Sequence, residues 1–167
     1  MKLPNVPETI VRRNFFFFNA VFALAAFIVD QLVKWFVLTS PKPLVSGDVL
    51  FLHYSVSPSI NQAFAFSIPA PTWAIYAIVL PILAVVLFLW RHAIKGGRLS
   101  SFAIAMVIAG AVGNLVDRLR LGGVVDYMEI VLGNVTWSSF NLADVLIVGG
   151  AIAWMYAHSQ KSVDPSW

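Results

Sequence analysis

The sequence contains no cysteine, and few of its 167 residues carry a charge. Without cysteine, the chain has no disulfide, no thiol nucleophile and no cysteine-based metal site, and its redox compartment is left open. The three histidines, His53, His92 and His158, lie too far apart for a local metal motif, so we expect no metal. Charged residues make up only 11% of the chain, the formal net charge is +3, and no basic run resembles a nucleic-acid stripe. We therefore expect no nucleic-acid partner.

Apolar residues are abundant instead. Hydrophobic residues account for 59% of the chain, and the mean hydropathy is +0.82. A soluble domain of this size could not bury that much apolar surface in its core. The length suits one domain. The composition therefore predicts an integral membrane protein, mainly α-helical, with a single membrane domain over residues 1–167.

Four apolar segments each approach the roughly 20 residues that a bilayer crossing requires. They cover about residues 15–38, 73–90, 99–115 and 140–158. The first follows two arginines and could be mistaken for a signal peptide. It is too long for a signal-peptide core and contains Asp30 and Lys34, so we expect it to be retained. The sequence therefore predicts four transmembrane helices.

The basic residues predict the orientation of these segments, because short cytosolic loops are enriched in lysine and arginine. Basic residues precede the first segment, separate the second from the third and follow the fourth, whereas the loop 39–72 contains only Lys42. Arg118 and Arg120, expected in the loop after the third segment, mildly oppose this pattern. We expect both termini in the cytosol and the two longer loops on the outer side.

The first outer loop has the pattern of a small sheet. The stretch "LVSGDVLFLHYSVSPSINQAFAFSI", residues 44–68, alternates β-prone with polar residues and contains two turn signals. We predict an antiparallel β-sheet at the membrane surface over about residues 42–68. The second outer loop, residues 122–139, is expected to carry a further strand or a short helix.

Polar residues gather toward the predicted outer boundary of the membrane. They are Asp30, Lys34, Asn61, Asn114, Asp117, Arg118, Asp126, Asn141 and Asp144. An ionisable group inside a bilayer costs at least about 2.5 kcal/mol on insertion scales, so several such groups indicate a functional site. Asp30 and Lys34 are four residues apart and share a helix face. Asn141 and Asp144 are three apart and also share a face.

Structural roles remain open for several of these residues. Asp30 and Lys34 could form a structural ion pair, and Asp117 with Arg118 an interfacial pair. Asn141 could simply cap the fourth helix, since an asparagine side chain accepts hydrogen bonds from free N–H groups at a helix start.

Asp126 and Asp144 fit a structural role least well, because neither has a basic neighbour within one helical turn. Two converging carboxylates are typical of an aspartyl protease, in which one stays protonated and the other activates water. A small proton- or ion-conducting membrane protein is the alternative. A serine–lysine hydrolase would need neutral Lys34, which Asp30 would keep charged.

Five motifs in order resemble those of lipoprotein signal peptidase, also called signal peptidase II. They are "VDQLVK" at 29–34, "INQAFAF" at 60–66, "GNLVDR" at 113–118, "VVDY" at 124–127 and "FNLAD" at 140–144. This family consists of bacterial inner-membrane aspartyl peptidases with four transmembrane helices and an outer β-cradle. The resemblance implies removal of signal peptides from prolipoproteins whose cysteine carries a diacylglyceryl group. It also implies that no metal or organic cofactor is needed.

The resemblance also implies roles for individual residues. Asp126 and Asp144 match the catalytic pair. Asp30 and Lys34 match a supporting pair, and the residues that match polar side chains lining the family's site are Asn61, Asn114, Arg118 and Asn141. The expected partners are the prolipoprotein and membrane lipid. The chain is expected to be a monomer in the inner membrane, with its active site toward the outer face.

One motif departs from the family pattern. After the asparagine the family usually reads Thr-Gly-Ala-Ala-Phe, whereas residues 62–66 here are Gln-Ala-Phe-Ala-Phe. Ala63 replaces a glycine that would allow close approach of substrate backbone, and Phe64 adds bulk. We expect a narrower pocket beside the cleavage site, and loss of activity stays open as an alternative.

Overall fold

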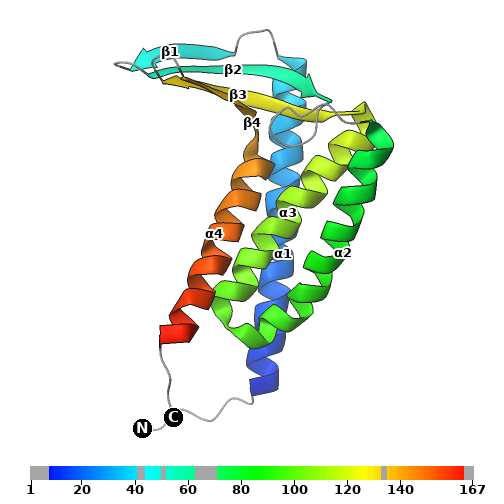
Figure 1. The fold of residues 1–167 in the computed structure, drawn as a ribbon, viewed down its shortest axis with the longest axis vertical. Helices are drawn as coiled ribbons and strands as arrows, with labels where there is room; N and C mark the ends of the chain where they lie inside the picture. Colours follow the sequence, from blue (N-terminus) through cyan, green and yellow to red (C-terminus); the bar gives the residue numbers. More distant parts are fainter. Residues whose placement is uncertain (1–7, 41–43, 50–51, 63–70, 133–134, 164–167) are drawn as a thin grey trace.

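The computed structural model describes residues 8–40, 44–49, 52–62, 71–132 and 135–163, and all structural statements concern these ranges. The helices are α1 (Glu8–Thr39), α2 (Thr72–Gly96), α3 (Arg98–Leu121) and α4 (Leu142–Val163). Figure 1 shows them as a bundle with a β-sheet across one end. Helix α1 starts, and α4 finishes, at the end of the bundle opposite the sheet.

Helix α3 forms the centre of the bundle and packs against each of the other three helices. Its buried residues are mostly small, among them Ala105, Ala109 and Gly110. Small side chains let helix backbones approach closely where lipid offers no hydrophobic drive for association. Large apolar side chains such as Phe17 and Trp35 of α1 point outward and are 70% and 63% exposed. A bundle with small buried side chains and large apolar side chains on its surface is suited to a lipid environment.

Within the described residues, three helical segments are long and apolar enough to cross a membrane: Asn14–Thr39, Arg98–Leu121 and Leu142–Ser159. Helix α2 contains a shorter apolar stretch, Tyr76–Phe88, and has Pro81 in its interior. The mainly helical, multi-pass membrane architecture predicted from the sequence is therefore confirmed. The membrane crossing by α2, and hence the count of four spans, stays a prediction.

The third helix is longer than expected. It continues to Leu121, so Arg118 and Arg120 lie in its last turn, and their placement in the following loop was wrong. The helix ends at Gly122, whose φ of 72° is left-handed and whose N–H donates to the carbonyl oxygen of Arg118 at 3.0 Å. A glycine adopts this conformation without steric cost, which explains where the helix stops.

The sheet combines strands from both outer loops. Its strands are β1 (Val45–Val49), β2 (Leu52–Asn61), β3 (Val124–Leu132) and β4 (Val135–Phe140), and they pair antiparallel in the order β1-β2-β3-β4. The predicted sheet over 42–68 accounts for only half of these strands. The second outer loop forms two strands, rather than one strand or a short helix. Ala63 and Phe64 lie outside the described residues.

An irregularity in the β2–β3 pairing lies beside Asp126. The register shifts between Val56 and Ser59, and pairing resumes with Ser59 opposite Asp126 and Asn61 opposite Val124. A shift of this kind bends a strand and changes the direction of its side chains. The irregularity thereby helps to set where Asn61 and Asp126 meet.

We predict that the α3–α4 contact tolerates a methyl group at Gly149 but not at Gly150. A β-carbon at Gly150 would lie 2.6 Å from the carbonyl oxygen of Ala103, whereas one at Gly149 would meet only the mobile end of Met106, at 3.3 Å. Because overpacking costs about 1–3 kcal/mol, Gly150→Ala should lower the thermal unfolding temperature in detergent. Gly149→Ala is the matched control and should unfold close to the parent. Equal unfolding temperatures for the two variants would contradict the packing described here.

Candidate active site

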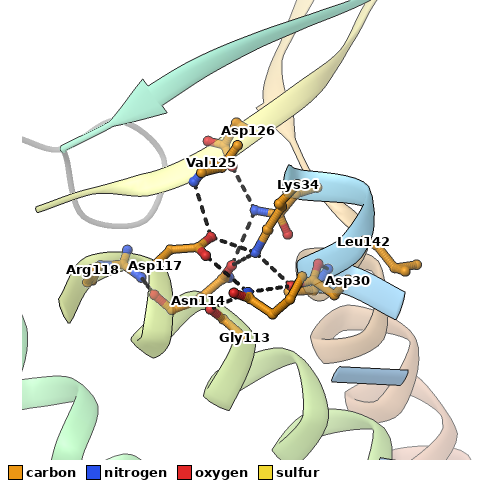
Figure 2. Close-up of polar contacts among 12 residues, drawn as sticks. Asp30, Lys34, Gly113, Asn114, Asp117, Arg118, Val125, Asp126 and Leu142 are labelled. Atoms are coloured by element: carbon orange, nitrogen blue, oxygen red, sulfur yellow. Dashed lines mark hydrogen bonds and ion pairs between the residues drawn. The ribbon is translucent and has the colours of Figure 1, made fainter. Parts of the chain in front are cut away.

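A buried lysine lies at the boundary between the bundle and the sheet. The Lys34 ammonium is 2.8 Å from Asp30 Oδ2 and 2.7 Å from Asp117 Oδ2, and it donates a hydrogen bond to Asn114 Oδ1 at 3.1 Å. All four side chains are buried, and Figure 2 shows them converging from α1 and α3. The ammonium has three N–H groups, and each has an acceptor. The pairing of Lys34 with Asp30 predicted from the sequence is present. Asp117, for which a pair with Arg118 was considered, is instead the second acidic partner of Lys34.

Each acidic partner of Lys34 also holds a backbone N–H group. Asp30 Oδ1 accepts from the N–H of Ala143 at 3.0 Å, and Asp117 Oδ2 accepts from the N–H of Val125 at 3.2 Å. Ala143 directly precedes Asp144, and Val125 directly precedes Asp126. The lysine cluster therefore fixes the chain one residue before each of the two predicted catalytic aspartates.

Asn141 forms a reciprocal cap with Asp144 at the start of α4. Asn141 Oδ1 accepts from the N–H of Asp144 at 3.0 Å, and the N–H of Asn141 donates to Asp144 Oδ2 at 3.2 Å. This is the capping-box arrangement, with an aspartate in the third helical position. The capping role considered for Asn141 from the sequence is thus present in the structure.

The same asparagine also reaches the other aspartate. Its side-chain nitrogen donates to Asp126 Oδ1 at 2.8 Å and to Asn114 Oδ1 at 3.2 Å. Asn114 in turn donates to Asp144 Oδ1 at 2.7 Å, and Asn61 donates to Asp126 Oδ2 at 2.9 Å. The two carboxylates are therefore joined through Asn141, by its side-chain amide to Asp126 and by its backbone N–H to Asp144, and three side-chain amides surround them.

The protonation of Asp126 is shifted by its surroundings. Burial raises the pKa of the Asp126 carboxyl above its ordinary value, because a carboxylate loses its hydration there. Hydrogen bonds from Asn61 and Asn141 act in the opposite direction, and the negative charge of Asp144 adds to the increase. Asp126 thus holds its proton to higher pH than a free carboxyl.

Arg118 lies in the last turn of α3 and is partly buried. The Arg118 guanidinium donates to the carbonyl oxygen of Asn114 at 3.4 Å. The hydroxyl of Tyr76 on α2 donates to the carbonyl oxygen of Arg118 at 3.1 Å. Its guanidinium adds positive charge at the end of the bundle that carries the two aspartates. Each predicted site residue is accordingly part of, or next to, one polar cluster.

Two residues of this cluster were missed. Gln31 donates to Asp117 Oδ1 at 3.0 Å, and the N–H of Leu142 donates to the hydroxyl of Tyr127 at 3.2 Å. Gln31 and Tyr127 lie inside the motifs "VDQLVK" and "VVDY". A neutral side chain gives no sign in the sequence of whether it is buried and hydrogen-bonded or exposed to solvent. Asn19, deeper in the bundle, donates to Ser101 and was missed for the same reason.

An apolar pocket of about 500 Å³ opens beside Asp144. Its walls come from β3, β4 and one face of α4, and the residues that line it besides Asp144 are Ile130, Phe140, Val145, Val148, Gly149 and Ile152. Among the described residues, no three His, Asp or Glu side chains are arranged to hold a metal ion. The independence from metal stays a prediction.

We predict that Lys34→Met destabilises the fold strongly, because it leaves the carboxylates of Asp30 and Asp117 buried without their cation. Removing one partner of a buried ion pair costs about 3–5 kcal/mol. Thermal unfolding in detergent should show this loss, and adding Asp117→Asn should recover part of it. Arg120→Met removes an exposed cation whose one described contact is a solvent-exposed hydrogen bond to Gln31 Oε1 at 3.3 Å, and it should change stability by less than about 0.5 kcal/mol. A Lys34→Met protein as stable as the Arg120→Met control would refute the role given to the cluster.

Comparisons with known proteins show the family of the chain. The sequence model of the signal peptidase II family matches residues 22–159. A lipoprotein signal peptidase of Xanthomonas axonopodis pv. citri (strain 306) is 37% identical over 139 residues, which is 77% of this chain and 79% of that protein. One from Sinorhizobium fredii (strain NBRC 101917 / NGR234) is 39% identical over 141 residues, or 79% of this chain and 80% of that protein.

Solved structures resemble the fold as well. A bacterial membrane enzyme determined by the in meso method at 2.3 Å resolution has a TM-score of 0.72 and 26% identity, covering 86% of this chain and 88% of that one. A second, at 1.9 Å resolution, has a TM-score of 0.68 and 27% identity, covering 83% and 90%. The family match spans most of the chain, and it is joined by relatives above 30% identity and by the same fold. The chain therefore belongs to the signal peptidase II family of membrane proteases.

Proposed function

We propose that this protein is a membrane aspartyl endopeptidase that removes signal peptides from prolipoproteins whose cysteine carries a diacylglyceryl group. The observation that carries the proposal is the link between the two carboxylates through Asn141, whose side-chain amide donates to Asp126 Oδ1 and whose backbone N–H donates to Asp144 Oδ2. A pair of carboxylates held by amide donors is the arrangement that water-mediated cleavage of a peptide bond requires.

The two carboxyl groups have different surroundings, which suggests different tasks. Burial favours the protonated form of Asp126. Asp144 lies in the first turn of α4, where the helix N-terminus favours negative charge. In the resting enzyme we expect the pair of carboxyl groups to hold one proton. We assign this proton to Asp126, and the role of base to Asp144.

In the proposed reaction, Asp144 takes a proton from a water molecule, and the water oxygen bonds to the scissile carbonyl carbon. Asp126 gives its proton to the carbonyl oxygen, so a neutral tetrahedral diol forms. Collapse of the diol breaks the carbon–nitrogen bond. The leaving nitrogen takes the proton held by Asp144, and one diol hydroxyl returns its proton to Asp126.

The surroundings of the pair are suited to a lipid-bearing substrate. The apolar pocket begins at Asp144, and the outward faces of α1 and α4 carry exposed apolar residues that acyl chains would cover. The sheet lies across the bundle end that holds the aspartates. We place this end at the outer membrane face and both termini in the cytosol, as the basic residues favour, and we propose that the enzyme acts as a monomer.

Ion conduction is not supported. The family consists of proteases, and the buried charges are bound to one another. Lys34 uses its three N–H groups within the bundle, and Asp30 and Asp117 are each held by Lys34 and by a backbone N–H. Such a cluster serves structure better than a moving ion.

We predict that Asp126→Asn and Asp144→Asn each abolish cleavage of a diacylglyceryl-modified prolipoprotein by purified protein in lipid. Either change removes one of the two proton-transfer groups, so the double variant should be hardly slower than the single ones. Loss of the signal peptide from the substrate is measured by gel mobility. Asp48→Asn, which changes an exposed acid in β1, is the control and should cleave normally. Only a few-fold loss in either single variant would disprove the assignment.

We further predict that Asn61→Ala moves the alkaline limb of the pH–activity profile to higher pH. The Asn61 amide donates to the Asp126 carboxylate and lowers its pKa, so removing the amide leaves the effect of burial less opposed and raises that pKa. The acid then keeps its proton to higher pH. Ser59→Ala, which removes only a hydrogen bond to the Asp126 carbonyl oxygen, should leave the limb in place. A limb that stays fixed or moves to lower pH in Asn61→Ala would exclude Asp126 as the acid.

A further inference from the structure

The first N–H groups of α4 are bound by side chains from two other elements and by the cap residue of the helix. A helix start leaves such groups without intrahelical acceptors. The N–H of Leu142 donates to the Tyr127 hydroxyl of β3 at 3.2 Å, that of Ala143 to Asp30 of α1 at 3.0 Å, and that of Asp144 to its own cap at 3.0 Å. Two of these acceptors have roles in the cluster already described. The phenol of Tyr127 contacts neither carboxylate and binds only the backbone of α4 in that cluster.

Tyr127 connects the two segments that carry the aspartates. Along the chain it is the residue after Asp126, and its hydroxyl binds the N–H two residues before Asp144. Its ring is buried and packs with Val37 and Val125. Burial raises the pKa of the phenol to about 12, so the group stays neutral and its oxygen is available as an acceptor.

We propose that Tyr127 is a positioning residue for the peptidase: its hydroxyl fixes the start of α4 against β3 and so sets the separation of Asp126 and Asp144. This inference rests on the proposed function of the aspartate pair. Asn141 also links these two segments, as part of α4's own cap, and the β3–β4 ladder pairs Met128 with Phe140 just before the helix. Of the hydrogen bonds described for these residues, only the one to the Tyr127 hydroxyl joins a backbone N–H of α4 directly to a side chain of β3.

The variant Tyr127→Phe isolates this contact. The ring is kept, so the apolar packing is kept, but the Leu142 N–H loses its acceptor and this end of α4 can move away from β3. Small misplacements of reacting groups lower the rate of the chemical step far more than substrate binding. We expect kcat to fall by roughly tenfold or more, with KM changed by less than about twofold.

The pH profile gives a readout that simple loss of folded protein would not change. The negative charge of Asp144 contributes to the raised pKa of Asp126. If the two carboxyls separate, that contribution shrinks and the alkaline limb should move to lower pH. At the sheet end of the surrounding elements, the charged groups are Asp30 and Lys34 of α1, Asp117, Arg118 and Arg120 of α3, Asp126 and Glu129 of β3, and Asp144 of α4. Tyr127→Phe alters none of them directly.

Tyr54→Phe is the matched control, because it deletes the hydroxyl of a partly exposed tyrosine on the neighbouring strand β2. It should leave kcat, KM and the profile unchanged. The proposal is overturned if Tyr127→Phe behaves like this control. It is equally overturned if kcat falls only in proportion to the folded fraction, with the shape of the pH profile preserved, since that result describes a structural role alone.

A spectroscopic test does not depend on activity. Asparagine is followed by leucine only at Asn114–Leu115 and Asn141–Leu142. Carbonyl-¹³C asparagine combined with ¹⁵N leucine therefore yields two amide signals, one for Leu142 and one for Leu115 inside α3 as an internal control. In Tyr127→Phe the Leu142 signal should shift and its amide should exchange with solvent faster, while the Leu115 signal stays fixed. Failure of the parent to cleave the prolipoprotein would remove the proposed function, whereas an unchanged Leu142 signal would remove the contact on which this inference depends.

Discussion

The ammonium group of Lys34 lies buried between two carboxylates, and the rest of the site is arranged around what those carboxylates bind next. Asp30 reaches the start of α4, and Asp117 reaches the start of β3. A buried ion pair offers little net stabilisation over apolar packing, because its charges lose their hydration. Its partners, however, tolerate few alternative arrangements. The cluster is therefore better understood as a device that fixes geometry than as a source of stability.

The amide side chains extend this geometry to Asp126 and Asp144, the proposed catalytic pair. Lys34 donates to the oxygen of Asn114, which leaves the nitrogen of Asn114 to donate to Asp144. The cap of α4 occupies the oxygen of Asn141, which leaves its nitrogen to donate to Asp126. The direction of each amide thus follows from a charge or a helix end. Both aspartates consequently receive donors that are already oriented before any substrate binds, which is the condition for electrostatic preorganisation.

Helix α4 serves this site at its first turn and the bundle along the rest of its length. Its backbone approaches α3 closely at Gly110 and Gly150, while its outward face presents Val145, Val148 and Ile152 beside the apolar pocket. One helix therefore carries a proposed catalytic carboxylate, a closely packed surface and one wall of the apolar pocket. Among the described residues, the buried polar side chains lie near the sheet end or around Asn19, Ser100 and Ser101, and the outward faces carry large apolar side chains that suit lipid.

Much of this architecture could be predicted from the sequence, because it depends on local composition and spacing. Apolar runs determined the helices, the alternating pattern determined β1 and β2, and the order of the motifs indicated the family and Asp126 with Asp144. The sequence did not predict β4, since short polar-rich strands become strands only by pairing with a neighbour. It also did not predict that Asp117 shares Lys34 with Asp30, because the two acids are 87 positions apart in the chain.

The sequence by itself determined which side chains are unusual for a membrane segment, because the cost of placing charge in lipid is a property of each residue. Only the tertiary structure decided which of them meet. The roles of Asn141, Gln31 and Tyr127 depend on hydrogen bonds between elements far apart in the chain, and a hydrogen bond forms only when donor and acceptor come within about 3 Å in the right direction. That distance is set by the packing of α1, α3, α4 and β3 against one another, which no local pattern records.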